Sequence, residues 1–317
     1  MTKRWVLVLM LLLFTAAFLV LFSNLFSEER PPRVYNVSML IRGMTSDSWS
    51  SVRQGAEQAA SEMNVELNFI TLSAENAVEE QISLLWRELD DGASAIILSA
   101  ADYDKLSAPV GRMLEKVPVV SLESPVRDQK VAAYVSADNY DMGLSLGNRV
   151  ANDMGRYGFR VFVLTDGSNL ENLRLRRQGL EDALTAGAGV EVVDVSVEDA
   201  LDPSKWPTGS GSPDAVVALE PAALEAAAQY FADQGSGETK LYGMGNSGKI
   251  ASFLDKGVIA AAVVQNDFGS GYLAVLSAVS ALENREAELG PGVEYRIIDS
   301  SNMYDTENQR LLFPFVR

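Results

Sequence analysis

Short apolar runs alternate with segments of helical periodicity along most of the chain, and this alternation constrains the fold more than any other feature of the sequence. In the first half it predicts the strands Val34–Ile41, Val65–Leu72, Ala95–Ser99 and Val117–Leu122, separated by the helices Ser51–Met63, Ala77–Asp90 and Asp104–Lys116. Runs of roughly four to eight apolar β-formers between polar clusters are typical of strands buried on both faces. A steady β–α alternation predicts an α/β fold, in which helices cover both faces of a parallel sheet.

A second series of the same kind begins at Asn139. Its predicted strands are Phe159–Leu164, Val190–Val195, Asp214–Leu219, Lys240–Met244, Val258–Val264 and Glu294–Ile298. A length of 317 residues is enough for two domains of ordinary size. We therefore expect two similar lobes, each with its own sheet.

The strand Val117–Leu122 ends in an acidic residue, Glu123. In an open parallel sheet, ligands bind outside the carboxyl ends of the strands, so Glu123 is a candidate binding residue. A second apolar run, Val131–Val135, leads into Ser-Ala-Asp-Asn, where Asp138 or Asn139 can cap a helix by accepting hydrogen bonds from its free N–H groups. This order of features is typical of one side of a cleft followed by its hinge.

Composition excludes several kinds of chemistry. The chain has no cysteine and no histidine, which excludes zinc sites built on these residues, iron–sulfur clusters, thiol chemistry, disulfides, a lipid-modified cysteine and a histidine base. Its net charge is −17, or −18 without residues 1–30, which contain three basic and two acidic residues. Such a field repels nucleic acids and anionic headgroups, so we expect neither as a partner of the globular part.

The first 33 residues are expected to be a membrane anchor and linker. Lys3 and Arg4 precede an apolar run, Trp5–Phe22, which is close to the length that a bilayer requires. No Ala-x-Ala cleavage signal follows, and the basic residues place the N-terminus in the cytoplasm and the rest outside. We expect an uncleaved anchor followed by the linker Glu28–Arg33, with a cleaved signal peptide as the alternative.

Seven features in order give the chain a family resemblance: the strand and loop Val37–Trp49, VVSLE, SADN, Arg174-x-x-x-x-Gly179, VVALE, YGMGNSG and IAAAVVQND. From Val34 onward the sequence resembles the type I periplasmic sugar-binding proteins, the ribose- and galactose-binding group that shares its fold with the LacI repressor core. The resemblance implies two Rossmann-like lobes, a cleft between them and a three-stranded hinge, with crossings near Ala137–Asn139, Gln265–Asp267 and Gly290–Glu294. The expected lobes are residues 34–137 with 265–291, and residues 138–264 with 292–317.

In the first lobe the resemblance implies three cleft residues. Trp49 follows the first strand, where the family keeps aromatics that stack on sugar rings, and Ser46 lies in the same loop. Glu123 takes the position of an acidic residue that holds sugar hydroxyls, although the family usually has Asp there. Asp138, at the first crossing, is a further candidate.

In the second lobe, Arg174 begins a signature that places a guanidinium in the family's cleft. Arg176 and Arg177 beside it are interpreted as surface charges, with an error of register left open. Glu220 stands where the family often has Asn. Gln265, which the expected boundaries place at the second crossing in the first lobe, stands where the family uses Gln.

The departures from the family pattern bear on the ligand. Asn246 lies beside Gly245, where the family usually supplies Asp, and acidic residues occupy positions 123 and 220. These differences argue against ribose-like specificity. Two carboxylates in the cleft would pair with Arg174 or suit a positively charged ligand such as an amino sugar.

A rival motif lies at Gly243–Gly248, which fits the dinucleotide pattern GxGxxG, with Asp267 nineteen residues further on. With Lys249 the stretch also approaches a P-loop, but Ile250 replaces the Ser or Thr that would hold Mg²⁺. The motif also comes late in the chain rather than on the first βα unit. We therefore expect these glycines to permit a tight turn at the cleft.

The expected function is non-catalytic capture of a sugar or sugar-like solute, with hinge closure around it and no cofactor. The globular part is expected to be a monomer outside the cytoplasm that presents its closed form to an ABC transporter permease. Alternatively it acts as a sensor subunit with a histidine kinase or chemoreceptor. A nucleotide-dependent oxidoreductase is a weaker alternative, and a repressor is excluded because residues 1–33 hold a hydrophobic span instead of a helix-turn-helix. The tail Leu311–Arg317 is expected to dock on a lobe near the hinge or to contact a partner.

Overall fold

The computed structural model describes residues 4–5, 8, 10–15, 18, 34–155, 158–186, 189–205, 212–235, 237–285 and 292–313. The chain divides into two compact units, Met1–Val34 and Tyr35–Arg317. In the first unit the described residues before position 34 are helical and exposed. Within the described part of the chain, no helix combines the length and the apolar character needed to cross a membrane. The expected linker, residues 28–33, lies outside the described residues, and the expected anchor stays a prediction.

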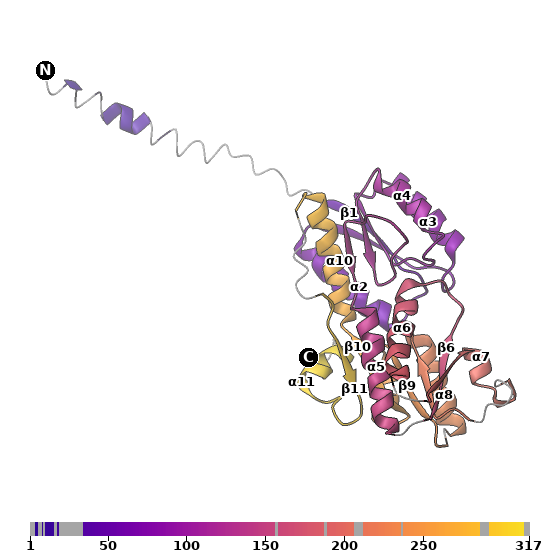
Figure 1. Cartoon of the computed structure of the whole chain (residues 1–317). Helices are drawn as coiled ribbons and strands as arrows, with labels where there is room; N and C mark the ends of the chain where they lie inside the picture. Colours follow the sequence, from indigo (N-terminus) through magenta and orange to yellow (C-terminus); the bar gives the residue numbers. More distant parts are fainter. Residues whose placement is uncertain are drawn as a thin grey trace. The chain divides into compact units, whose positions relative to one another are not determined.

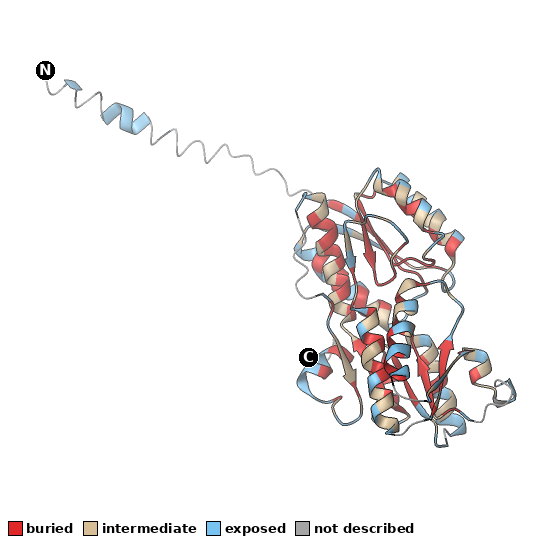
Figure 2. Cartoon of the chain, viewed as in Figure 1, coloured by how far each residue is buried: buried red, intermediate tan, exposed pale blue. Residues whose placement is uncertain are grey.

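The second unit contains two sheets, as the two βα series predict (Figure 1). The first sheet is parallel and has the order β2-β1-β3-β4-β5. Its strands are β1 (Tyr35–Leu40), β2 (Val65–Ile70), β3 (Ala95–Leu98), β4 (Val119–Leu122) and β5 (Ala133–Val135), and its helices are α2 (Asp47–Glu62), α3 (Val78–Asp90) and α4 (Ser107–Leu114). Every residue of β3 and β4 is buried, so these central strands are covered on both faces (Figure 2).

The second sheet has the order β11-β10-β9-β8-β6-β7. Its strands are β6 (Arg160–Thr165), β7 (Glu191–Ser196), β8 (Ala215–Ala218), β9 (Lys240–Met244), β10 (Ile259–Gln265) and β11 (Tyr295–Ile298). The accompanying helices are α5 (Asn139–Met154), α6 (Glu171–Thr185), α7 (Val197–Ala200), the 3-10 turn Pro203–Lys205, α8 (Pro221–Gln234), α9 (Gly248–Asp255) and α11 (Thr306–Leu312).

One edge strand corrects the prediction of purely parallel sheets. The strand β11 runs antiparallel to β10, and its first residue, Tyr295, pairs with Gln265, the last residue of β10. The chain thus enters β11 at the carboxyl edge of the second sheet and runs away from that edge. A parallel strand needs a crossover connection within its own sheet, usually a helix. The chain reaches β11 through a hinge segment instead, so β11 can run antiparallel to β10.

Helix α10 (Asp267–Leu282) returns the chain to the first sheet. It begins directly after β10 but packs against α2 and against β3, β4 and β5 (Figure 1). The first lobe is therefore defined here as the first sheet with α2, α3, α4 and α10, and the second lobe as the second sheet with its remaining helices. The chain passes between the lobes after β5, after β10 and before β11, while the lobe boundaries expected from the sequence stay predictions.

Glycines allow α2 and α10 to lie in backbone contact. A Cβ atom on Gly271 would lie 1.8 Å from the carbonyl oxygen of Val52, and one on Gly55 would lie 1.9 Å from that of Phe268. No side chain fits at such distances, so these two positions require glycine. This contact fixes α10, and with it the β10–α10 crossing, to the first lobe.

A second pair of glycines joins α5 to α6. A Cβ atom on Gly143 would lie 2.1 Å from the carbonyl oxygen of Arg176, and one on Gly179 would lie 2.1 Å from that of Tyr140. The close approach sets the rotation of α6 about its axis. It therefore decides which arginine of this helix faces the first lobe.

The C-terminal segment is partly docked. Leu311 and Leu312, at the end of α11, are buried in the core of the second lobe. Residues 314–317 lie outside the described residues. Docking of the tail on a lobe thus holds for its first two residues.

We predict that Gly271→Ala lowers the free energy of unfolding by roughly 1–3 kcal/mol, the usual cost of overpacking a tight interface. Alanine ordinarily favours a helix over glycine by about 0.5–1 kcal/mol, so the expected sign is the reverse of the propensity effect. Urea denaturation measures the change. Gly111→Ala in α4 is the matched control, because its new Cβ would meet only the flexible side-chain end of Gln129. A Gly271→Ala variant as stable as the parent would refute the close contact.

Candidate functional site

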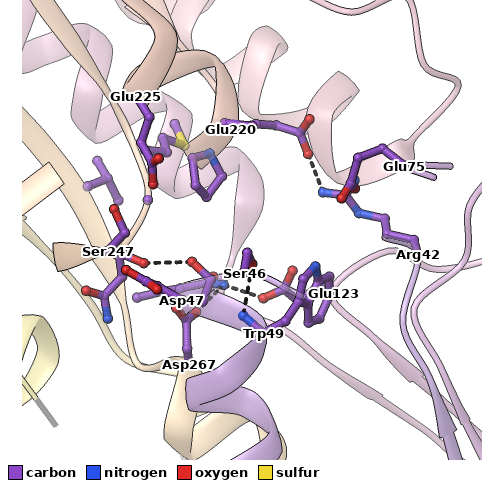
Figure 3. A pocket seen from close by; sticks show the side chains of 18 of the residues that line it. Arg42, Ser46, Asp47, Trp49, Glu75, Glu123, Glu220, Glu225, Ser247 and Asp267 are labelled. Atoms are coloured by element: carbon purple, nitrogen blue, oxygen red, sulfur yellow. Dashed lines mark hydrogen bonds and ion pairs between the residues drawn. The ribbon is translucent and has the colours of Figure 1, made fainter. Parts of the chain in front are cut away.

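A cavity of about 200 Å³ lies between the two lobes, at the carboxyl ends of their strands (Figure 3). The first lobe and α10 contribute Arg42, Ser46, Asp47, Ser48, Trp49, Glu75, Asn76, Glu123 and Asp267. The second lobe contributes Met142, Arg176, Glu220, Pro221, Ala222, Glu225, Met244, Gly245, Asn246, Ser247, Val263 and Gln265. Pockets for drug-sized ligands have roughly 300–1,000 Å³, so this cavity suits a small solute.

The loop between β1 and α2 supplies the aromatic wall. Ser46 caps α2, and its hydroxyl accepts a hydrogen bond from the backbone N–H of Trp49 at 3.3 Å. This cap fixes the first turn of the helix. The Trp49 side chain lines the cavity while only 7% of the residue is exposed. A rigid ring in this position can stack on the C–H face of a solute.

Arg42 and Glu220 form an ion pair between the lobes (Figure 3). Arg42 follows β1, and Glu220 follows β8 and precedes α8. The second nitrogen of the Arg42 fork, Nη1, donates to Asn76 Oδ1 at 3.3 Å. Its Nε is buried and has no hydrogen-bond partner among the described residues. Burial disfavours the charge of Arg42, but the carboxylates of Glu220 and Glu123 outweigh it and raise the pKa of Arg42.

Glu123, Gln265 and Asp267 meet at the hinge side of the cavity. The Gln265 amide nitrogen donates to Glu123 Oε1 at 2.5 Å and to Asp267 Oδ1 at 3.0 Å. Burial, and after it the charge of Glu123, raises the pKa of Asp267 well above its usual value. Glu123 also has a backbone φ of 57°, a left-handed conformation that is uncommon outside glycine. Such strain persists where the surroundings hold it, and it is concentrated at functional sites.

Further hydrogen bonds join the lobes on both sides of the cavity. On one side the Ser48 hydroxyl donates to the backbone oxygen of Asn246 at 2.7 Å, and the N–H of Gly248 donates to Asp47 Oδ2 at 3.1 Å. On the other side the N–H of Tyr103 donates to the backbone oxygen of Asn169 at 2.8 Å. With the Arg42–Glu220 pair, these contacts hold the lobes closed over the cavity.

The arginine of α6 that lines the cavity is Arg176, two positions after the expected Arg174. Arg174 lies outside the cavity, with 60% of its side chain exposed, and pairs with Glu171 at 2.6 Å. Arg176 lines the cavity instead; it is buried and donates to Asn139 Oδ1 at 2.8 Å and to the backbone oxygen of Leu219 at 2.9 Å. Burial lowers the pKa of Arg176.

Helix geometry explains this shift of register. Residues two apart on a helix differ by about 200° in direction, so only one of Arg174 and Arg176 can face inward. Gly179 faces α5, and Arg176 lies three residues before it, on the same face of the helix. The glycine packing therefore selects Arg176.

Two other expected residues have local partners. Asp138 is exposed and does not line the cavity; its Oδ1 caps α5 by accepting from the N–H of Asp141 at 3.0 Å. Asn246 lines the cavity, but its amide nitrogen donates to the backbone oxygen of Leu311 at 2.6 Å. The Asn246 side chain thus ties the cavity turn to α11.

The expected residues Ser46, Trp49, Glu123, Glu220 and Gln265 do come together around the cavity. Sequence reasoning missed Arg42, which directly follows the first predicted strand. The rule that ligands bind outside the carboxyl ends of parallel strands would have selected it. Asp267 was considered only as part of a dinucleotide motif.

The glycine-rich motif has a structural use. A Cβ atom on Gly243 would lie 2.7 Å from the backbone oxygen of Ala218, so this glycine permits close strand packing. Gly245 has a φ of 149° and turns the chain, and the Ser247 hydroxyl caps α9 by accepting from the N–H of Ile250 at 3.1 Å. The turn forms one wall of the cavity, as the sequence predicts.

A two-lobed α/β chain with a cavity between the lobes at its strand ends has the architecture of a hinged binding protein. The family model described as periplasmic binding protein domain matches residues 37–286, so the chain belongs to this family. Its members are extracytoplasmic solute-binding proteins and not enzymes.

Individual relatives are more distant. The ABC transporter periplasmic-binding protein YphF of Escherichia coli (strain K12) is 27% identical over 142 residues, which are 42% of this chain and 43% of that protein. A carbohydrate transporter solute binding protein from Agrobacterium radiobacter, solved in complex with D-arabinose, has a TM-score of 0.81 at 22% identity, covering 89% of this chain and 100% of that one. The XylFII-LytSN complex has a TM-score of 0.74 at 21% identity, covering 85% and 99%. At these identities the structures establish the fold.

The raised pKa of Asp267 predicts a pH effect on the stability of the unliganded protein. An acid with a raised folded-state pKa contributes stability that is complete below its unfolded pKa of about 3.9 and is lost as the pH rises through the folded value. We take the free energy of unfolding of the parent minus that of Asp267→Asn. This difference should decrease as the pH rises above 4, by up to about 1.4 kcal/mol per pH unit. Urea denaturation at several pH values measures it. The control is Asp90→Asn, at an exposed position of α3. A difference that rises with pH would contradict the assignment.

Proposed function

We propose that this protein captures a sugar or sugar-like solute in the cavity between its lobes and releases it unchanged. The observation that carries the proposal is that two cavity-lining side chains each have a buried polar atom without a partner. Arg42 Nε and Gln265 Oε1 are buried and have no hydrogen-bond partner among the described residues, although both belong to cavity-lining side chains. Buried polar groups are almost always hydrogen-bonded, so a ligand with hydroxyl groups is the natural partner.

The remaining lining supports a sugar. A pyranose or furanose has an apolar C–H face and a rim of hydroxyl groups that both donate and accept. Trp49 offers a ring for the C–H face of the sugar. Donors and acceptors for its hydroxyl groups come from Arg42, Glu123, Glu220 and Gln265. The carbohydrate transporter solute binding protein that is solved in complex with D-arabinose agrees with this class of ligand.

Closure of the lobes would tell a membrane partner that the solute is bound. The ligand can shift an open–closed equilibrium only through contacts that it gains in the closed state. Trp49 and Glu123 lie on one lobe and Arg176 and Gln265 on the other, so a solute between them gains contacts as the gap closes. The closed form then presents a surface that differs from the open one.

The proposed recipient of the solute is an ABC transporter permease, as the name of the Escherichia coli relative suggests. A sensor subunit that works with a histidine kinase is the second candidate. Two observations favour it: no cysteine is available for lipid attachment, and a protein of the same fold is solved in the XylFII-LytSN complex. Both candidates place the globular part outside the cytoplasm behind the proposed N-terminal anchor, and co-purification with each class of membrane protein would distinguish them.

Replacing Trp49 should weaken sugar binding. We expect Trp49→Leu to raise the dissociation constant of the tightest sugar by roughly fivefold to tenfold, because leucine keeps apolar volume but loses the stacking face. Isothermal titration calorimetry against a panel of pentoses, hexoses and amino sugars gives the affinity. Trp86→Leu is the matched control, since Trp86 lies on α3 outside the cavity lining. Arg174→Ala should also leave the affinity unchanged. No binding of any sugar by the parent chain would refute the proposed function.

A further inference from the structure

We propose that the solute carries a protonated amine, and that its ammonium group binds on the cavity side of the carboxylates of Glu123 and Asp267. The inference rests on the proposed function and narrows its ligand class to amino sugars. It follows from the charges of the cavity wall, from the partners that these charges have, and from the polar atoms left without one.

The cavity wall carries more negative than positive charge. Its acidic side chains are Asp47, Glu75, Glu123, Glu220, Glu225 and Asp267, and its basic side chains are Arg42 and Arg176. One of the two cations is already neutralised, because Arg42 pairs with Glu220. The other, Arg176, donates hydrogen bonds to neutral oxygens of Asn139 and Leu219.

Several of the acidic groups have partners of their own. Asp47 Oδ2 accepts from the N–H of Gly248, and Glu75 Oε1 accepts from the N–H of Met44 at 2.9 Å. Glu225 pairs with Lys249 at 3.3 Å on the outer side. Asp47 and Glu75 are also exposed to solvent, so the buried carboxylates without an ion pair are Glu123 and Asp267. The charge of Arg176 acts on both of them and offsets part of their negative charge.

Glu123 and Asp267 are buried, with 9% and 3% of their surfaces exposed. Among the described residues, neither forms an ion pair with lysine or arginine; the amide nitrogen of Gln265 lies between them and donates to both. Two buried carboxylates that share one neutral donor disfavour each other's charge. A cation supplied by the ligand would remove this penalty.

An ammonium group fits the acceptors that are present. It has three donors and no acceptor, and the site offers the Glu123 carboxylate, the Asp267 carboxylate and the unpartnered Gln265 Oε1. A neutral hydroxyl has a single donor and would leave acceptors unsatisfied. The acceptor count therefore favours an amine over a hydroxyl at this end of the cavity.

At the end of the cavity where Arg42 lies, the ligand group that fits best is a neutral hydrogen-bond acceptor. Arg42 is 7% exposed and its Nε lacks a partner among the described residues, but its charge is already paired with Glu220. A hydroxyl oxygen satisfies this N–H without bringing further charge, whereas a carboxylate would have to compete with Glu220. An amino sugar, with hydroxyls and one amine, matches both ends better than an amino acid does.

Isothermal titration of the full chain at pH 7 with matched sugar pairs tests the inference. The pairs are glucosamine with glucose, galactosamine with galactose and mannosamine with mannose, and glycine serves as the amino acid probe. We expect at least one amino sugar to bind ten or more times tighter than its parent hexose. The amine inference would be overturned if the parent hexoses bound as tightly as the amino sugars or more tightly, or if only glycine bound. Binding of a hexose would still leave the proposed function intact. Absence of all sugar binding would refute both.

Two near-isosteric variants locate the amine. Glu123→Gln and Asp267→Asn should each weaken amino sugar binding by ten times or more and parent hexose binding by less than about three times. Glu57→Gln is the control, since it removes the same charge from the exposed face of α2, where Glu57 pairs with Arg53. Melting points of the unliganded variants check the fold, and Glu123→Gln carries the test alone if Asp267→Asn fails to fold. Equal loss for both classes of sugar would overturn the inference.

Discussion

The site depends on the direction of the strands. Within each lobe the parallel strands end at one edge of the sheet, because each parallel connection must carry the chain back across the sheet before the next strand begins. The chain passes between the lobes at these same edges, after β5 and after β10. Both lobes therefore turn their strand ends toward one gap. Residues as distant in the sequence as Arg42 and Glu220 meet there without any local signal that pairs them.

Each lobe contains a pair of helices in backbone contact. Glycines bring α2 against α10 and α5 against α6 at backbone distance, so little adjustment is available inside either lobe. Asp267 begins α10 at the second crossing, and Gln265 ends β10 just before it. A ligand that bonds to these two residues touches the hinge itself. The proposed solute binding would thereby be coupled to lobe position through a segment of three residues, 265–267.

Much of this arrangement could be predicted from the sequence. The β–α alternation predicted two sheets and nearly all of their strands, since continuous apolar runs show buried parallel strands directly. Glu123 was selected because it ends a predicted strand, whereas the family resemblance implied Trp49 and Gln265. The direction of β11 was missed, because an isolated apolar run does not reveal the end from which the chain enters it.

Three residues expected at the site, Arg174, Asp138 and Asn246, have local partners that a sequence pattern does not show. Arg174 and Arg176 differ only in the face of α6 on which they lie, and that face is set by the packing of Gly179 on α5, which a sequence pattern does not show. Asp138 and Asn246 are polar residues at the right places in the chain, but a helix cap and the backbone of Leu311 use their side chains. Competition between local hydrogen bonds and a ligand is decided by geometry.

The central claim is that the two lobes close on a solute. Because the chain has no cysteine, two spin labels can be attached without background, at Glu115→Cys on the first lobe and Gln229→Cys on the second, both at exposed positions. Pulsed electron–electron resonance then measures the distance between the labels with and without the tightest-binding sugar. The account predicts a broader, longer distance distribution in the free protein and a shorter, narrower one with the sugar. A distribution that saturating sugar leaves unchanged would contradict it.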